Sequence, residues 1–123
     1  MTVSPGWKDW GLGRSGVSAT AMSPKMPFGT TVAHGYLSLS LLPLLLGQVM
    51  TVTDAKMGVN YGFERVRFMA PVRSGKRVRG RFVLARFEEK KPGQWQFVHN
   101  VIVEIEGEEK PALVADWIGL IFL

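Results

Sequence analysis

The stretch Phe28-Gly-Thr-Thr-Val-Ala-His-Gly-Tyr-Leu-Ser-Leu-Ser-Leu-Leu-Pro-Leu-Leu-Leu46 decides how the rest of this chain can fold. From Tyr36 onward, Ser38 and Ser40 are its only polar interruptions. A surface helix carries a polar face with a period of 3.6 residues, and this stretch has almost none. It is also shorter than the roughly 20 apolar residues that span a bilayer. We therefore expect a helix that the rest of the protein buries on all sides.

The ends and the middle of this helix carry their own signals. Thr30 or Thr31 is a suitable N-cap, and Gly47 stands where helices commonly end. Gly35 lies in the first turn, where unpaired N–H groups suit an oxyanion or a polarised carbonyl. Pro43 removes one helical hydrogen bond, so we expect a kink there.

The chain after the helix reads as four strands separated by turns. Alternation of apolar and polar residues indicates the strands, and Ser-Gly and Pro-Gly pairs indicate the turns. The pattern predicts an α+β fold, with an antiparallel meander curled around one hydrophobic helix. The expected strands are Met57–Ala70, Arg77–Glu88, Trp95–Glu106 and Ala112–Leu123, and the expected turns are Ser74-Gly75, Glu89–Gly93 and Gly107–Pro111.

Residues 1–26 differ from the rest of the chain. They contain Trp7 and Trp10 among many glycines and serines, and they follow neither a helical nor a strand period. We expect an irregular segment here, followed by one folded domain over residues 27–123.

Composition excludes several classes of function. The chain has no cysteine, which excludes disulfides and thiol catalysis, and its two histidines, His34 and His99, argue against a metal centre. No signal peptide is recognisable at the start, so we expect a cytoplasmic protein. The net charge of +5 favours an anionic partner, which nucleic acid, a membrane or a phosphorylated metabolite would each satisfy.

Two segments carry a resemblance to a known family. Pro27–Pro43, with its Ala-His-Gly tripeptide, and Asn60–Gly75 resemble the MaoC-like dehydratases, and Lys110–Ala115 also fits. These are hotdog-fold relatives of the (R)-specific enoyl-CoA hydratases. The resemblance implies a homodimer whose sheets wrap the central helices. It also implies a substrate carried as a coenzyme A thioester, with no separate cofactor, and water added to a trans-2-enoyl thioester or removed in reverse.

The resemblance also implies a site. The backbone N–H of Gly35, next to His34, would hold the thioester carbonyl. Catalysis in this family uses an Asp-x-x-x-x-His pair upstream of the Phe-Gly segment, whereas this sequence has only Asp9 before Phe28 and no histidine. The catalytic residues therefore stay unassigned. We hypothesise either divergence or a shifted frame or start, and we expect turnover near background.

Other residues each allow two interpretations. His34 suits either a backbone hydrogen bond at the helix entry or a replacement base. Ser40 suits either a local bond to a backbone carbonyl or a substrate contact. Asn60 and Tyr61 suit either substrate contact or a bulge that opens the long strand. His99 reads as a half-exposed strand residue.

A run of basic residues lies on two adjacent strands and the turn between them. It suits either a solvated strand face or a site for the phosphates of coenzyme A at Arg73, Lys76 and Arg77. The leading hypothesis is therefore a hydratase of the MaoC-like type. The alternative is a non-catalytic hotdog protein that binds acyl-CoA or only dimerises. Nucleic acid is disfavoured as a partner because the aromatic residues do not alternate with the arginines, and we expect no membrane partner.

Overall fold

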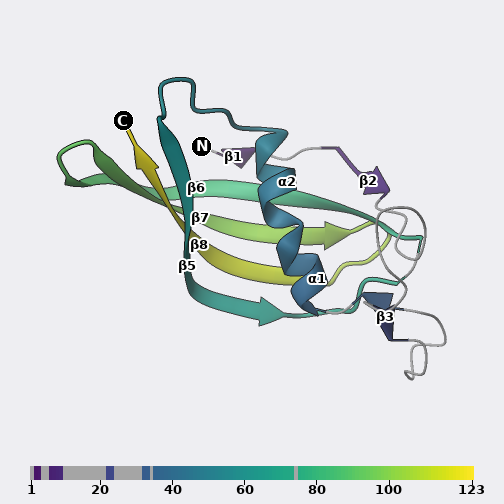
Figure 1. The fold of residues 1–123 in the computed structure, drawn as a ribbon. Coiled ribbons are helices and arrows are strands. Elements are labelled where there is room, and N and C mark those ends of the chain that lie inside the picture. The colour runs from purple at the N-terminus through teal and green to yellow at the C-terminus, as the bar shows by residue number, and fades with distance from the viewer. Residues whose placement is uncertain (1, 4–5, 10–21, 24–31, 34, 74) are drawn as a thin grey trace.

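A computed structural model describes residues 2–3, 6–9, 22–23, 32–33, 35–73 and 75–123 of the chain. Four long antiparallel strands form most of one sheet, and a helix in two pieces crosses one of its faces (Figure 1). The long strands are β5 (Met57–Phe68), β6 (Arg77–Lys91), β7 (Gln94–Ile105) and β8 (Leu113–Phe122), and the helices are α1 (Gly35–Ser40) and α2 (Leu42–Gly47).

The order of the strands corrects the predicted meander. β6, β7 and β8 are neighbours in chain order, but β5 pairs with β8 and not with β6. The chain therefore crosses from one side of the sheet to the other between β5 and β6. The result is an antiparallel sheet around one central helix, which is the hotdog arrangement expected from the resemblance.

Among the described residues, four two-residue strands accompany the long ones, two of them at the β6 edge of the main sheet and two in a separate small sheet. β1 (Thr2–Val3) and β2 (Lys8–Asp9) pair with β6, and β3 (Met22–Ser23) pairs with β4 (Val32–Ala33). Trp7 lies between β1 and β2, and its ring covers the guanidinium of Arg79 at 4.4 Å. The proposed N-caps Thr30 and Thr31, as well as Trp10, lie outside the described residues. The domain boundary after residue 26 stays a prediction.

The helix breaks at the position that Pro43 predicts. α1 ends at Ser40, Leu41 forms a turn, and Pro43 occupies the first turn of α2, where its missing N–H is tolerated. The N–H of Leu41 donates to the carbonyl of Ser38 at 3.2 Å. This bond spans three residues, as in a 3₁₀ turn, and not the four of an α-helix. α2 ends at Gly47, as expected.

The expectation that the helix is buried on all sides is wrong for the single chain. Leu42, Leu45 and Leu46 face the sheet and are buried, whereas the side chains of Tyr36 and Leu44 are 67% and 52% exposed. One sheet can cover only one side of a helix. The apolar residues on the opposite side therefore form part of the surface.

The core lies between α2 and the inner face of the sheet. Val78, Phe82, Val101, Val103 and Ile105 are all buried, as the strand alternation predicts. In β6, Gly80 leaves room for the helix, because a Cβ atom there would lie 3.3 Å from the Leu45 side chain and closer still to Phe82. The glycine thus sets how near α2 approaches the sheet.

The strands differ from prediction mainly at their ends. Residues 89–91, expected in a turn, continue β6, and the turn is confined to Pro92 and Gly93, whose φ of 76° favours glycine. β5 bends strongly in Figure 1, and register shifts occur between Asn60 and Gly62 and between Phe63 and Arg65. Such bulges bend a strand and increase its twist.

Candidate functional site

Three of the residues expected to contact substrate meet at one cavity. Ser40 at the end of α1 and Asn60 and Tyr61 in β5 line a space of about 300 Å³ between the helix and this strand. Tyr36 and Trp117 complete its aromatic wall. These residues come from three distant parts of the sequence, so only the fold brings them together. The remaining lining residues are Leu39, Leu42, Pro43, Gly62 and Phe63.

Asn60 is oriented by the indole of Trp117. The Trp117 Nε1–H donates to Oδ1 of Asn60 at 3.1 Å. Because an indole nitrogen can only donate, the amide must turn its oxygen toward Trp117, and its NH₂ group points elsewhere. This arrangement fixes one face of the cavity. Trp117 itself is buried and stacks on Phe63, with ring centroids 6.3 Å apart.

Tyr61 lies in the first bulge of β5. The pairing with β8 passes from Asn60–Gly119 to Gly62–Ile118, so Tyr61 has no residue opposite it in β8. Its side chain is 65% exposed at the cavity. The bulge that we expected is therefore present. A bulge can re-aim a side chain, so its presence is compatible with a substrate contact, which stays a prediction.

Ser40 makes the local bond expected of a serine in a helix. Its Oγ donates to the backbone carbonyl of Leu37 at 2.6 Å. The hydroxyl proton is used by this bond, but the oxygen keeps lone pairs that can accept a hydrogen bond from a ligand.

Gly35 has a packing reason to be glycine. It is the first residue of α1, and a Cβ atom there would lie 3.0 Å from Cδ1 of Phe68. Phe68 in turn meets Tyr36 edge to face, with ring centroids 5.6 Å apart. His34 lies outside the described residues. The thioester-binding role of this helix start therefore stays a prediction, whereas the packing of Gly35 against Phe68 is observed.

The basic run is mostly neutralised by carboxylates on the neighbouring strand. Arg77 forms two hydrogen bonds with Glu106, of which Nη2–Oε1 measures 2.6 Å, and Arg79 and Arg81 both bind Glu104 at 2.6 and 3.2 Å. These pairs favour the interpretation as a solvated strand face. In addition, Arg65 approaches Asp116 at 3.4 Å.

These contacts shift the pKa values of both glutamates. Partial burial raises the pKa of Glu104, but its hydrogen bonds and charge interactions with two arginines outweigh this, and the pKa is lowered. Hydrogen bonding to Arg77 lowers the pKa of Glu106, an exposed group. Both carboxylates are therefore ionised near neutral pH. Of the three cations proposed for phosphate binding, Arg77 is engaged by Glu106. In the part of the chain that the structure describes, no carboxylate forms an ion pair with Arg73 or Lys76.

The expectation that His99 is half-exposed is wrong. Its side chain is only 3% exposed, and the rings of Phe82 and Phe97 meet it edge to face at centroid distances of 6.1 and 5.1 Å. Burial lowers its pKa. The strand alternation already contained this answer, because His99 falls on the same face as Val101 and Val103.

The described residues also bear on metal sites and membrane spans. Within the described ranges, histidine, aspartate and glutamate side chains form no group of three or more that could hold a metal ion. Among the helices that the structure describes, none is long and apolar enough to cross a membrane.

Comparison with known proteins places the chain in a family. Residues 17–106 match the model of the MaoC like domain. The chain belongs to this family. The sequence is 48% identical over 96 residues to nodulation protein N of Rhizobium leguminosarum bv. viciae, covering 77% of this chain and 60% of that protein. It is also 48% identical over 90 residues to 3-hydroxyacyl-thioester dehydratase Z of Mycobacterium tuberculosis, covering 73% and 60%.

A solved structure supports the fold of this MaoC-like domain. The (R)-hydratase from A. caviae, described as involved in PHA biosynthesis, superposes with a TM-score of 0.65 at 18% identity. The match covers 97% of this chain and 92% of that one. By contrast, the chain spans about 60% of the length of the two relatives named above.

Proposed function

We propose that this chain binds an acyl-CoA thioester in the cavity between α1 and β5 and serves a hydratase or dehydratase reaction. In hydration, the oxygen of water bonds to C3 of a trans-2-enoyl thioester and a proton is added at C2. Dehydration reverses both steps. The observation that carries the proposal is the convergence of Ser40, Asn60 and Tyr61 on one cavity, within a domain whose relatives include a 3-hydroxyacyl-thioester dehydratase.

The cavity offers groups suited to a thioester. The amide NH₂ of Asn60 and the phenol of Tyr61 are donors at the wall of a mostly apolar space. We propose that the N–H groups at Gly35, with His34 beside them, hold the thioester carbonyl, where negative charge develops as the enolate forms. Tyr36, the next residue, lines the cavity and so connects the helix start with it.

Binding of crotonyl-CoA, measured by titration calorimetry, tests the site. Asn60→Asp keeps an acceptor for the Trp117 indole but replaces the amide donors with a negative charge, so we expect affinity to fall about tenfold. Ile102→Ala is a matched control, because Ile102 is a partly exposed residue of β7 outside this cavity. Unchanged affinity in both Asn60→Asp and Tyr61→Ala would remove this cavity from consideration.

Turnover is a separate question from binding. The printed sequence contains no Asp-x-x-x-x-His pair, and a positioned acid–base pair typically contributes about 10²–10⁴-fold in rate. We therefore expect crotonyl-CoA hydration near background for these 123 residues, and recovery when a family-type segment with this pair is joined in frame before Phe28. Binding without turnover in both forms would favour the non-catalytic alternative. Robust hydration by the unextended chain would return attention to His34 as a base.

Arg73 and Lys76 supply a second test of the ligand. We propose that they contact phosphates of coenzyme A, with Arg77 held by Glu106 beside them. Replacing Arg73 and Lys76 by serine should weaken coenzyme A binding several-fold and reduce its salt dependence, since exposed charges are screened by salt. Crotonyl-pantetheine, which lacks the nucleotide phosphates, should bind equally well to both forms. Equal losses for the two ligands would contradict a phosphate contact.

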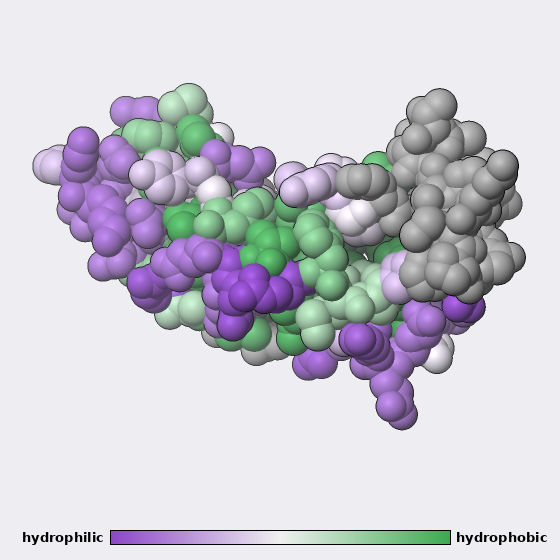
Figure 2. All heavy atoms as spheres, turned by 90° about the horizontal axis from the view of Figure 1, so that it is seen from below, coloured by the Kyte–Doolittle hydropathy of each residue, from purple (hydrophilic) through white to green (hydrophobic). Residues whose placement is uncertain are grey.

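We also propose a homodimer, which the resemblance implies. The apolar β8 lies between β7 and β5 and is largely buried, so it does not supply the surface for a second copy. The helix and β5 carry many of the exposed large apolar side chains. Figure 2, seen from below the view of Figure 1, shows apolar surface in the middle of the described part of the molecule. On the helix and β5, the largest exposed fractions belong to Tyr36, Leu44, Met57 and Tyr61.

A further inference from the structure

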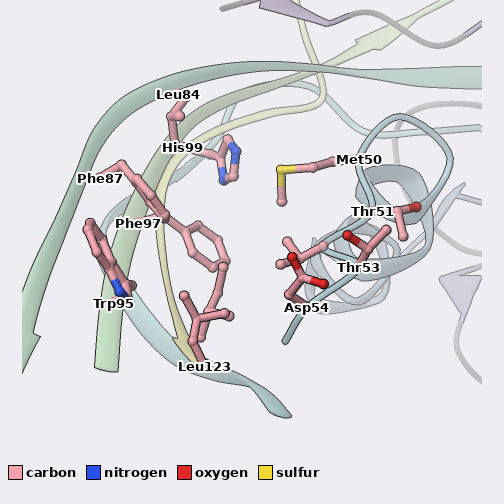
Figure 3. Close-up of a pocket in the computed structure, with 12 residues that line it drawn as sticks. Met50, Thr51, Thr53, Asp54, Leu84, Phe87, Trp95, Phe97, His99 and Leu123 are labelled. Carbon is pink, nitrogen blue, oxygen red and sulfur yellow. The ribbon is translucent and has the colours of Figure 1, made fainter. Parts of the chain in front are cut away.

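A second cavity lies at the other end of the sheet. It encloses about 400 Å³ between the connection that follows α2 and the ends of β6, β7 and β8 (Figure 3). Phe87, Trp95 and Phe97 form its aromatic wall, with Phe87 stacked on Trp95 at a centroid distance of 4.9 Å. Among the described residues, it shares no lining residue with the cavity of Ser40, Asn60 and Tyr61. A space of this volume with mostly apolar walls is typical of a small-molecule site.

His99 gives this cavity a polar group that lacks a protein partner. Its side chain is 3% exposed, and Nδ1 has no hydrogen-bond partner in the part of the chain that the structure describes. Buried polar atoms of this kind are uncommon, because leaving one unpaired is costly. In Figure 3, the edge of the imidazole that bears both nitrogens faces the side of the cavity where Met50 lies. The nitrogen-bearing edge of the imidazole therefore forms part of the cavity wall.

The surroundings define what would complement this imidazole. Burial lowers the pKa of His99, so the ring is neutral near pH 7 and offers one donor and one acceptor. Across the cavity, Thr51 and Thr53 carry hydroxyl groups and Asp54 carries a carboxyl group. A neutral imidazole gives an anion no charge to pair with, and the nearby carboxylate of Asp54 repels one. The site therefore suits an uncharged ligand.

We propose that this cavity binds an uncharged small molecule with an apolar body and one hydroxyl or carbonyl group that hydrogen-bonds to the imidazole of His99. The apolar body packs on Phe87, Trp95 and Phe97. This site shares no lining residue with the thioester cavity proposed above, and the proposal stands whether or not the chain binds acyl-CoA.

Two probes of matched shape test the proposal. p-Cresol and toluene differ by one hydroxyl group, and toluene is the more hydrophobic, so a purely apolar cavity would bind toluene more tightly. We expect p-cresol to bind saturably and about fivefold more tightly than toluene because it makes the missing hydrogen bond. Tighter binding of toluene, or no saturable binding of either probe, would overturn the proposal.

The chain has only two histidines, so the contact between p-cresol and His99 can be observed directly by NMR. In a chain with isotope-labelled histidine, the imidazole signals that disappear in His99→Phe belong to His99. p-Cresol should move these signals in the parent chain along the same titration curve that gives its affinity. This readout needs no variant to bind the probe. Saturable binding that leaves the His99 signals unmoved would place the probe elsewhere and contradict the proposal.

Variants separate this cavity from its neighbour. His99→Phe preserves an aromatic ring between Phe82 and Phe97, and it should abolish the preference for p-cresol. Tyr61→Ala, which alters the thioester cavity, should leave p-cresol binding unchanged, as should Ile102→Ala. Loss of p-cresol binding in Tyr61→Ala would assign the probe to the thioester cavity and overturn the proposal without bearing on acyl-CoA binding.

Discussion

β5 and β7 have the same length of 12 residues but occupy opposite kinds of position in the sheet. β7 has a partner on each side, and its inner face is buried. β5 lies at the end of the described strand order, and none of its residues is buried. The difference teaches that the sheet is held together around β7, whereas β5 leaves its apolar side chains at the surface of the single chain.

The largest expected effect compares truncations in the two strands. Ile105 in β7 is 1% exposed, so Ile105→Ala should lower the free energy of unfolding by about 2–5 kcal/mol through lost burial and a cavity. Val59→Ala in β5 should cost the monomer less than about 0.5 kcal/mol, as an exposed substitution usually does. Urea unfolding at low protein concentration measures both. Equal losses would mean that β5 belongs to the core after all.

Gly119 and Gly58 allow the packing around β7 and β5 to be compared at single positions. Gly119 in β8 is covered by the ring of Phe97 from β7, and a Cβ atom there would lie 2.1 Å from Cζ of that ring. Gly119→Ala should therefore cost about 1–3 kcal/mol by overpacking. At Gly58 in β5 a Cβ atom meets only a backbone oxygen at 4.0 Å, so Gly58→Ala should be nearly neutral. Thermal unfolding of the two variants decides whether β7 packs as tightly as described.

The exposed side of β5 predicts self-association. Placing a charge in an apolar interface is unfavourable, so Tyr61→Lys should weaken a homodimer about tenfold or more. Sedimentation equilibrium at micromolar concentration measures the dissociation constant. Ile102→Lys is the matched control, because it places the same charge at another exposed hydrophobic residue, on β7. A parent chain that remains monomeric would exclude the homodimer.

The smallest expected effect is a dependence of the free energy of unfolding on pH, caused by His99 in β7. The folded protein holds the pKa of His99 below its ordinary value, so the unfolded chain binds more protons once the pH falls below about 6.5. Stability should therefore decline as the pH falls below that value. Glu104 and Glu106, whose pKa values are also lowered, contribute stability that is lost only below about pH 4.3.

Urea midpoints between pH 7 and pH 5 isolate the histidine. His99→Phe should remove the part of the slope that His99 causes, while Asp54, which lines the same cavity, remains in both proteins. An identical slope in the variant and the parent would show that the imidazole is not buried in its neutral form.

The sequence was informative wherever a residue acts on its own chain neighbours. Pro43 predicted the break in the helix, and the alternation of Val101 and Val103 predicted the buried face of β7. It failed where the outcome depends on which distant strand becomes a neighbour. Local patterns contain no information that β5 pairs with β8, and this pairing decides that β8 is buried and that β5 is not.

The candidate site also divides into features set by local sequence and features set by contacts between distant segments. Ser40, Asn60 and Tyr61 were named individually from the sequence, but their common cavity depends on the crossing of the helix over β5. Trp117 was missed because its role in orienting Asn60 is a contact between residues far apart in the chain. The burial of His99 differs, because its alternation with Val101 in the sequence already indicates the buried face of β7.

The broken helix has a consequence for the order of folding. α1 and α2 have six residues each, and isolated helices that short are not stable in water. β6, β7 and β8 follow one another through short turns, whereas Met57 must find Phe122 across nearly the whole of that meander. Closing such a large loop costs entropy before any contact compensates for it. The three-stranded meander should therefore form first, and the helix and β5 should gain their structure only by docking on it.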